Sequence, residues 1–293
     1  MLFLILSVVT STLLNIILKS FAKFEINTFQ AIVFNYWVCT FTGSLIENYY
    51  TFQNVNAINQ PWFLYAIILG VSFIILFNLM GWTAQKLGLA IVSISNKLSL
   101  LIPVLIAIVY MNESTTPIKI TAILLALLAV IMVTISPSNN SEKAKKDWLV
   151  ILLPLVLFFG SGLNDTIVIH VQKSFLSSIG DDSKFVIWIF QFAALIGSII
   201  LISQLLLGKS KFQFKNLVAG ICLGIPNYFS MYYLVKALSN TNMPSSLLLP
   251  INNVSIVIVS TVVGIFLFKE KLSKIQFLGI GLACFSIIIL FLS

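Results

Sequence analysis

Apolar residues occur along this chain in long runs, and short polar stretches separate them. A helix needs about 20 predominantly apolar residues to cross the hydrocarbon core of a bilayer. The runs that approach this length are ten, at residues 2–19, 29–46, 62–84, 88–111, 117–135, 148–170, 184–207, 214–238, 243–268 and 273–292. The pattern predicts an all-α integral membrane protein with ten transmembrane helices.

A polar tract, SPSNNSEKAKKD at residues 136–147, divides the runs into five and five. A shift of 157 residues aligns the fourth and fifth runs with the ninth and tenth, placing Asn96 on Asn253 and Glu113 on Glu270. Because five is odd, the second set must enter the membrane with the opposite orientation. We therefore expect two inverted five-helix repeats around a central cavity, an architecture found in many secondary transporters. The expected division is a first repeat at 1–135, a linker at 136–147 and a second repeat at 148–293.

Composition agrees with a membrane protein and excludes several other classes. Hydrophobic residues make up 59% of the 293 residues and charged residues 9%, which excludes an ordinary soluble domain. The net charge of +8 comes entirely from lysines, which fall singly or in small groups between apolar runs, so we expect no nucleic-acid partner. The three cysteines lie inside apolar runs at unrelated spacings, and the chain has one histidine. We expect no disulfide framework, no metal site and no cofactor.

Lys97 lies near the middle of the fourth apolar run. A charged side chain at that depth is costly, so such residues face a protein interior or a water-filled cavity and mark a pathway. Ser95, Asn96 and Ser99 add polar groups around it, and Pro103 removes a helix hydrogen bond further along. This stretch is expected to form the wall of a polar cavity.

Other polar residues inside the runs recur at equivalent positions of the two halves. Asn96 corresponds to Asn253, and Asn15 corresponds to Asn164. Side chains related by the pseudo-two-fold axis of an inverted repeat tend to converge near the midplane, where transporter sites lie. The candidate residues for substrate binding or proton coupling are Asn15, Ser95, Asn96, Lys97, Asn164, Asp165, Asn227, Asn252 and Asn253.

Asp165 has two interpretations. It lies about three turns into the sixth run, where it is a candidate counter-ion for Lys97 or a proton carrier. Alternatively the sixth helix ends early and Asp165 lies among the lipid headgroups. In the eighth run, Gly224 and Pro226 immediately precede Asn227, and this segment is the best candidate for a broken helix.

The residues also resemble a known family. The fourth run contains Pro103 and ends at Met111-Asn112-Glu113, and the ninth run ends in a corresponding way at Phe268-Lys269-Glu270-Lys271. With these features the chain resembles the EamA-like branch of the drug/metabolite transporter superfamily. The resemblance covers essentially the whole chain. It implies a ten-helix basket whose cavity is lined mainly by the first, third, fourth, sixth, eighth and ninth helices. It also implies export or exchange of small organic metabolites.

The favoured function is secondary transport of a small organic metabolite across the cell membrane by alternating access. An amino acid or an organic anion would suit Lys97, which could instead carry a coupling proton. The alternatives are a membrane scaffold and a membrane-embedded enzyme; a single histidine at the edge of a run makes an enzyme the poorer interpretation. The expected partners are the small-molecule substrate, protons and the lipid bilayer, and the sequence leaves open a monomer or a homodimer.

Lysines also predict the orientation in the membrane. Lys97 apart, twelve lie in or beside the odd-numbered loops and four beside the even-numbered loops. Short lysine-rich loops stay in the cytoplasm, so the count places both termini outside. The family commonly has both termini in the cytoplasm, so the charge count and the resemblance disagree, and we favour the charge count.

Overall fold

The computed structural model of the chain is helical, with no strand in the residues that it describes. Those residues are 2–53, 55–103, 106, 117–135, 148–176, 181–240 and 245–292. Within these ranges, seven helices are long and apolar enough to cross a membrane. The predicted class, an all-α membrane protein, is confirmed.

The helices coincide with the apolar runs of the sequence. They are α1 (Leu2–Lys23), α2 (Thr28–Glu47), α3 (Phe63–Leu87), α4 (Leu89–Lys97), α6 (Pro117–Ile135), α7 (Trp148–Phe175), α8 (Asp181–Leu206), α9 (Phe214–Asn240), α10 (Ser245–Phe268) and α11 (Lys274–Leu292). Short 3-10 helices lie at Thr51–Gln53, Val55–Asn59 and Leu98–Leu100 (η1, η2 and η3). The linker at 136–147 and Glu113 lie outside the described residues.

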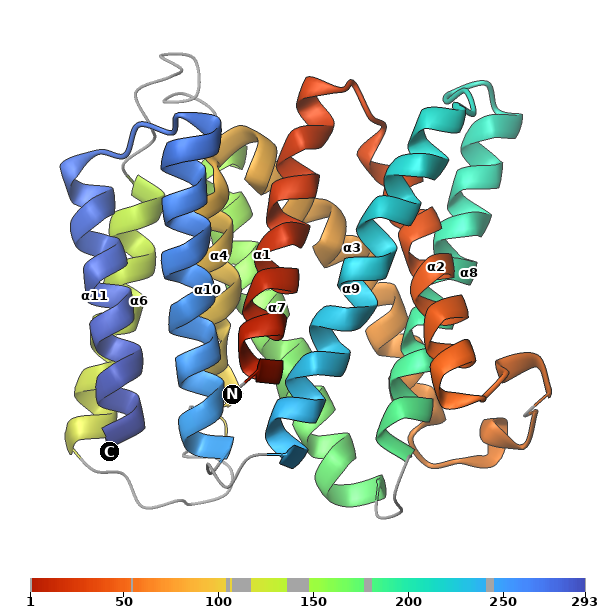
Figure 1. The fold of residues 1–293 in the computed structure, drawn as a ribbon, viewed down its shortest axis with the longest axis horizontal. Helices are drawn as coiled ribbons and strands as arrows, with labels where there is room; N and C mark the ends of the chain where they lie inside the picture. Colours follow the sequence, from red (N-terminus) through yellow and green to blue (C-terminus); the bar gives the residue numbers. More distant parts are fainter. Residues whose placement is uncertain are drawn as a thin grey trace.

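The helices form a single bundle in which both termini lie at the same end (Figure 1). α6, α10 and α11 stand at one side of the bundle, and α2, α8 and α9 stand at the other. α1, α3, α4 and α7 occupy the middle. The connections that follow α1, α8 and α10 lie at the end opposite the termini, which we call the loop end. Lysines of the odd-numbered loops gather there, including the exposed Lys23, Lys209, Lys211, Lys269 and Lys271.

Apolar side chains cover the outside of the bundle. Leu206 is 83% exposed, Phe266 is 80% exposed and Ile199 is 69% exposed. Polar residues such as Asn15, Asn35 and Gln191 are buried inside. This distribution is the one that a lipid environment favours, because the exterior meets hydrocarbon while polar groups find partners within the bundle.

Contacts between helices occur in pairs that are related by exchange of the two halves. The contact of α3 with α8 has its counterpart in α9 with α2, and that of α1 with α9 has its counterpart in α7 with α3. Two glycines 154 residues apart permit one such pair of close crossings. A Cβ atom on Gly70 would lie 2.5 Å from Cβ of Phe192, and one on Gly224 would lie 2.6 Å from Cβ of Val38. Val38 and Phe192 are also 154 residues apart, so the two crossings correspond residue by residue.

The interruption of helical structure falls in the fourth run, not in the eighth. α9 continues as an α-helix through Gly224 and Pro226, so the predicted break there is wrong. Gly220 and Gly224 instead let α9 pack closely on α2, as expected of small residues spaced four apart. In the fourth run, α4 ends at Lys97 and η3 follows directly. Pro103, which has no N–H to donate to the carbonyl of Ser99, lies just after this segment.

Candidate functional site

A cavity of about 230 Å³ lies among the middle helices. Its polar lining comes from α1, α4, α7 and α9, and consists of Ser11, Asn15, Ser93, Asn96, Lys97, Ser161, Asn164, Asp165, Asn227 and Ser230. Its apolar lining consists of Leu14, Tyr36, Phe73, Leu76, Phe77, Met80, Leu157, Phe190, Met231 and Ile256. Sites for drug-sized ligands measure about 300–1,000 Å³, so this cavity suits a small metabolite.

Lys97 is the cationic residue of the cavity wall. It ends α4 at the point where the helix tightens into η3, and a mid-helix 3-10 segment often marks a functional site or hinge. Within the described part of the chain, its ammonium group forms no hydrogen bond and no ion pair within 4.0 Å. The group is partly buried and faces a cavity, so its charge is available to a ligand.

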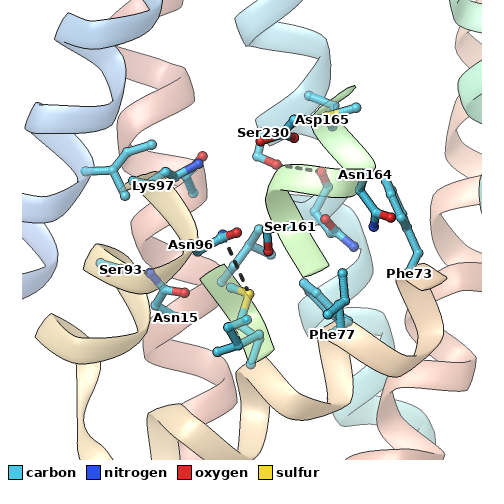
Figure 2. Close-up of a pocket in the computed structure, with 18 of the residues that line it drawn as sticks. Asn15, Phe73, Phe77, Ser93, Asn96, Lys97, Ser161, Asn164, Asp165 and Ser230 are labelled. Carbon is cyan, nitrogen blue, oxygen red and sulfur yellow. Dashed lines mark hydrogen bonds between the residues drawn. The ribbon is translucent and has the colours of Figure 1, made fainter. Parts of the chain in front are cut away.

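Asp165 is the anionic residue of the same wall. The Ser99 hydroxyl lies 3.2 Å from its Oδ2 and is placed to donate a hydrogen bond. α7 continues beyond Asp165 as far as Phe175, so the early end of the helix, which would have put Asp165 among the headgroups, does not occur. In Figure 2, Lys97 and Asp165 come from different helices on opposite sides of the view. Ser230 lies between them in this view, and Asn96 and Ser161 lie below.

Asn15 connects three helices at the edge of the cavity. Its Nδ2 lies 2.9 Å from Oγ of Ser93 on α4 and 3.4 Å from Oγ of Ser260 on α10. Its Oδ1 is buried and has no partner among the described residues. Figure 2 shows the Asn15 and Ser93 side chains beside each other. These bonds fix α1, α4 and α10 relative to one another at one side of the cavity.

The other predicted amides divide into two groups. Asn96, Asn164 and Asn227 line the cavity. Asn96 has only a weak contact, 4.0 Å from the Met80 sulfur, and Asn164 makes no hydrogen bond within the described ranges. Asn227 donates to Oδ1 of Asn35 at 3.1 Å. Asn96 and Asn164 therefore keep free hydrogen-bonding groups in the cavity, whereas Asn227 shares its amide with the helix contact.

Ser95, Asn252 and Asn253 are not among the residues that line this cavity. Ser95 is buried on the face of α4 turned away from Ser93, because two residues correspond to about 200° of helix rotation. Asn252 is buried with Oδ1 unpartnered, and Asn253 is partly exposed. Asn253 lies on the same face of α10 as Ile256 and Ser260, about one turn before Ile256, and it does not line this cavity with Asn96.

The aromatic part of the wall was not predicted from the sequence. Rings of Tyr36 on α2 and Phe190 on α8 lie 6.0 Å apart, and Phe73 on α3 lies 6.4 Å from Phe190. The Tyr36 hydroxyl donates to the carbonyl of Phe73 at 2.9 Å, so Tyr36 presents mainly its ring. In a membrane protein, aromatic residues occur on lipid-facing and cavity-facing surfaces alike, and hydropathy does not separate the two.

The residues that line the cavity offer groups suited to recognition of a small molecule. Among the described residues, no cluster of histidine, cysteine, aspartate or glutamate could hold a metal ion. His170 does not line the cavity; it is exposed and packs edge-on against Tyr65 and Phe175. One cation, one anion, several amides and hydroxyls, and a wall of rings can bind a small polar molecule that has an apolar part.

No family model matches the chain. The chain is similar to an uncharacterized protein of Haemophilus influenzae, with 25% identity over 283 residues. The alignment covers 94% of this chain and 93% of that protein, so the similarity extends over both halves of the bundle.

Proposed function

We propose that the protein is a secondary transporter that moves a small organic metabolite across the membrane by alternating access. The observation that carries this proposal is the placement of Lys97 and Asp165 in one cavity between membrane-spanning helices. Charges inside a membrane protein are costly, and they are retained where they bind a solute or move a proton. A lining drawn from helices of both halves fits a site between two moving repeats.

We further propose that the chain consists of two inverted five-helix repeats of the EamA-like kind. The paired helix contacts and the corresponding glycine crossings support this. The cavity lining adds support, because Ser11, Leu14 and Asn15 on α1 have the same spacing as Ser161, Asn164 and Asp165 on α7. The offset between these two sets is 150 residues. This offset is one residue longer than the offset that pairs Asn15 with Asn164 in the sequence.

The proposed substrate carries a carboxylate that binds Lys97. An amino acid would also place its ammonium group near Asp165 and its side chain against the rings of Phe73 and Phe190. An organic acid is the second candidate, with a proton on Asp165 taking the place of the ammonium group. A cation and an anion in one small cavity favour the amino acid, because a single zwitterion neutralises both.

The alternatives from the other classes have less support. A membrane-embedded hydrolase needs a nucleophile beside a base, and the polar lining of the cavity has serines but no histidine. A scaffold does not need a lysine and an aspartate facing a cavity between its helices. Both alternatives predict that no small solute crosses the membrane.

The test combines binding with transport. The purified protein is heated with amino acids and with matched N-acetylated and amidated derivatives, which lack one charge each. A ligand at 100 times its dissociation constant should stabilise the fold by about 2.7 kcal/mol, and the derivatives should stabilise it less. Stabilising compounds are then tested for counterflow in proteoliposomes. Binding without counterflow would favour a protein that binds a small molecule and does not transport it. The absence of both binding and counterflow for every class of compound would overturn the proposal.

A further inference from the structure

A second polar cluster lies outside the cavity, where Glu270 follows the end of α10. Its carboxylate pairs with the ammonium group of Lys19 on α1. Its Oε1 also accepts a hydrogen bond from the backbone N–H of Leu89, the first residue of α4, at 2.9 Å. The two side chains are largely buried, with 15% exposure for Lys19 and 10% for Glu270. One carboxylate therefore joins α1, α4 and α10.

Two glycines shape the space around this carboxylate. A Cβ atom on Gly88 would lie 2.8 Å from Oε2 of Glu270, and one on Gly264 would lie 2.5 Å from the same atom. Gly88 also has a φ of 108°, which favours glycine. The backbone N–H of Glu270 donates to the carbonyl of Gly264 at 3.1 Å. The carboxylate is held in a fitted pocket, which is unlike a loosely paired surface charge.

The cluster lies one helical turn from the cavity, toward the loop end. Asn15, Ser93 and Ser260 already join α1, α4 and α10 at the edge of the cavity. Lys19 lies four residues beyond Asn15, Leu89 four residues before Ser93, and Gly264 four residues beyond Ser260. Two groups of interactions, one helical turn apart, therefore hold the same three helices together. The group farther from the cavity contains the charged side chains.

We infer that the cluster of Lys19, Glu270 and the Leu89 N–H, here called the latch, holds the cavity closed toward the loop end. This inference rests on the proposed function, because a carrier must open and close each end in turn. Opening toward the loop end requires α1, α4 and α10 to separate, and this separation breaks the latch. Hydrogen bonds to charged groups are stronger than neutral ones, so the latch favours the closed arrangement at that end.

The test measures access to the cavity from each face of the membrane. A cysteine replaces Ser11, a cavity residue on α1, and a membrane-impermeant thiol reagent is applied from one face or the other. Labelling is counted above that of the parent protein, which has Cys39, Cys222 and Cys284. E270Q should raise labelling from the loop end about fivefold or more and lower it from the opposite end, since removing the latch shifts the population toward the other state. Lys19→Gln should act in the same direction but less, because the bond to Leu89 remains.

The matched control is Glu25→Gln, an exposed carboxylate in the loop after α1 at the same end. It should leave labelling unchanged. Equal labelling of Ser11→Cys alone and of Ser11→Cys combined with E270Q or with Lys19→Gln would overturn the latch. If E270Q does not insert, Lys19→Gln alone decides. The labelling measurement needs no substrate. If the protein transports a solute but the variants do not change the labelling, the latch is refuted and the proposed function is not. A change in labelling without transport of any solute refutes the transporter and keeps the latch.

Discussion

α3 and α9 make equivalent contacts on their packing sides and differ on the sides that face the cavity. Gly70 and Gly224 lie at corresponding close crossings with α8 and α2. Counted with the same offset of 154 residues, Phe73, Leu76 and Phe77 of α3 correspond to Asn227, Ser230 and Met231 of α9. All six line the cavity, and two of the three pairs exchange an apolar for a polar residue.

The difference separates two kinds of constraint. Where helices cross without room for a Cβ atom, both halves keep glycine, because a side chain would force the backbones apart. Where the helices face the cavity, the halves are free to differ. The cavity therefore has a ring-lined side and a polar side. A ligand with an apolar part and a charged part fits such a cavity in one orientation.

The largest expected effect is on the cavity side. Lys97→Met should weaken binding of a carboxylate ligand by about 10- to 100-fold, because a hydrogen bond to a charged group contributes about 1.5–3 kcal/mol. Folding should be retained, since methionine has similar length and suits the membrane. Dissociation constants from thermal stabilisation measure the loss, and Lys86→Met, at an exposed end of α3, is the control. Normal binding by Lys97→Met would remove Lys97 from the site.

The next effect tests the packing side. Gly70→Ala and Gly224→Ala should each lower the free energy of unfolding by about 1–3 kcal/mol, because overpacking forces side chains or backbone to move. Gly281→Ala on α11 is the matched control, since nothing lies within 4 Å of its added Cβ and alanine favours helix. Thermal melts in detergent measure all three. A loss at only one of Gly70 and Gly224 would contradict the equivalence of the two crossings.

A smaller effect distinguishes the two sides of the cavity. Phe73→Leu should cost about 0.5–1.5 kcal/mol in binding ligands with an aromatic part, which is the usual contribution of an aromatic pair. It should leave binding of ligands without that part unchanged. Ser230→Ala, at the polar side, should weaken binding of both kinds of ligand by the same factor. The ratio of dissociation constants for two ligands that differ in one ring is the measurement; an unchanged ratio in Phe73→Leu, or a changed ratio in Ser230→Ala, would mean that the two sides are not distinguished.

The smallest effect concerns the fourth and ninth runs. Asn96→Ala should weaken binding by about 1 kcal/mol, the contribution of a typical hydrogen bond, while Asn253→Ala should leave binding unchanged. Cysteine at position 96 should react with a small water-soluble thiol reagent faster than cysteine at position 253. Equal reaction rates would indicate that Asn253 reaches the cavity in another conformation.

Sequence patterns were sufficient to predict the helices and to place Lys97 in a cavity wall, whereas they left Asp165 open between the cavity and the lipid headgroups. The apolar runs match the helices because hydrocarbon thickness sets their length. Lys97 and Asp165 stood out because charges are rare at such depth. Ser93, Asn96 and Lys97 have the spacing of one helix face, so this spacing could have identified Ser93 and excluded Ser95.

Other features depend on tertiary structure that a single sequence does not encode locally. Asn253 was paired with Asn96 by alignment, but the level at which α10 meets the cavity is set by its packing on α1 and α4. The position of a proline did not predict where the helix geometry changes. α9 remains continuous at Pro226, whereas the fourth run changes geometry at Lys97. The ring-lined side consists of residues whose hydropathy suits lipid equally well.

The pairing of one lysine with one aspartate in the cavity wall has an electrical consequence. With Lys97 protonated and Asp165 ionised, the charges fixed in the cavity sum to zero. Moving one elementary charge through a membrane voltage of 100 mV changes the free energy by about 2.3 kcal/mol. In the proposed transport cycle, the protein without cargo would therefore reorient without moving net charge of the cavity, and the voltage would not act on that step. The current carried in each cycle would then equal the charge of the cargo and of any ion that accompanies it.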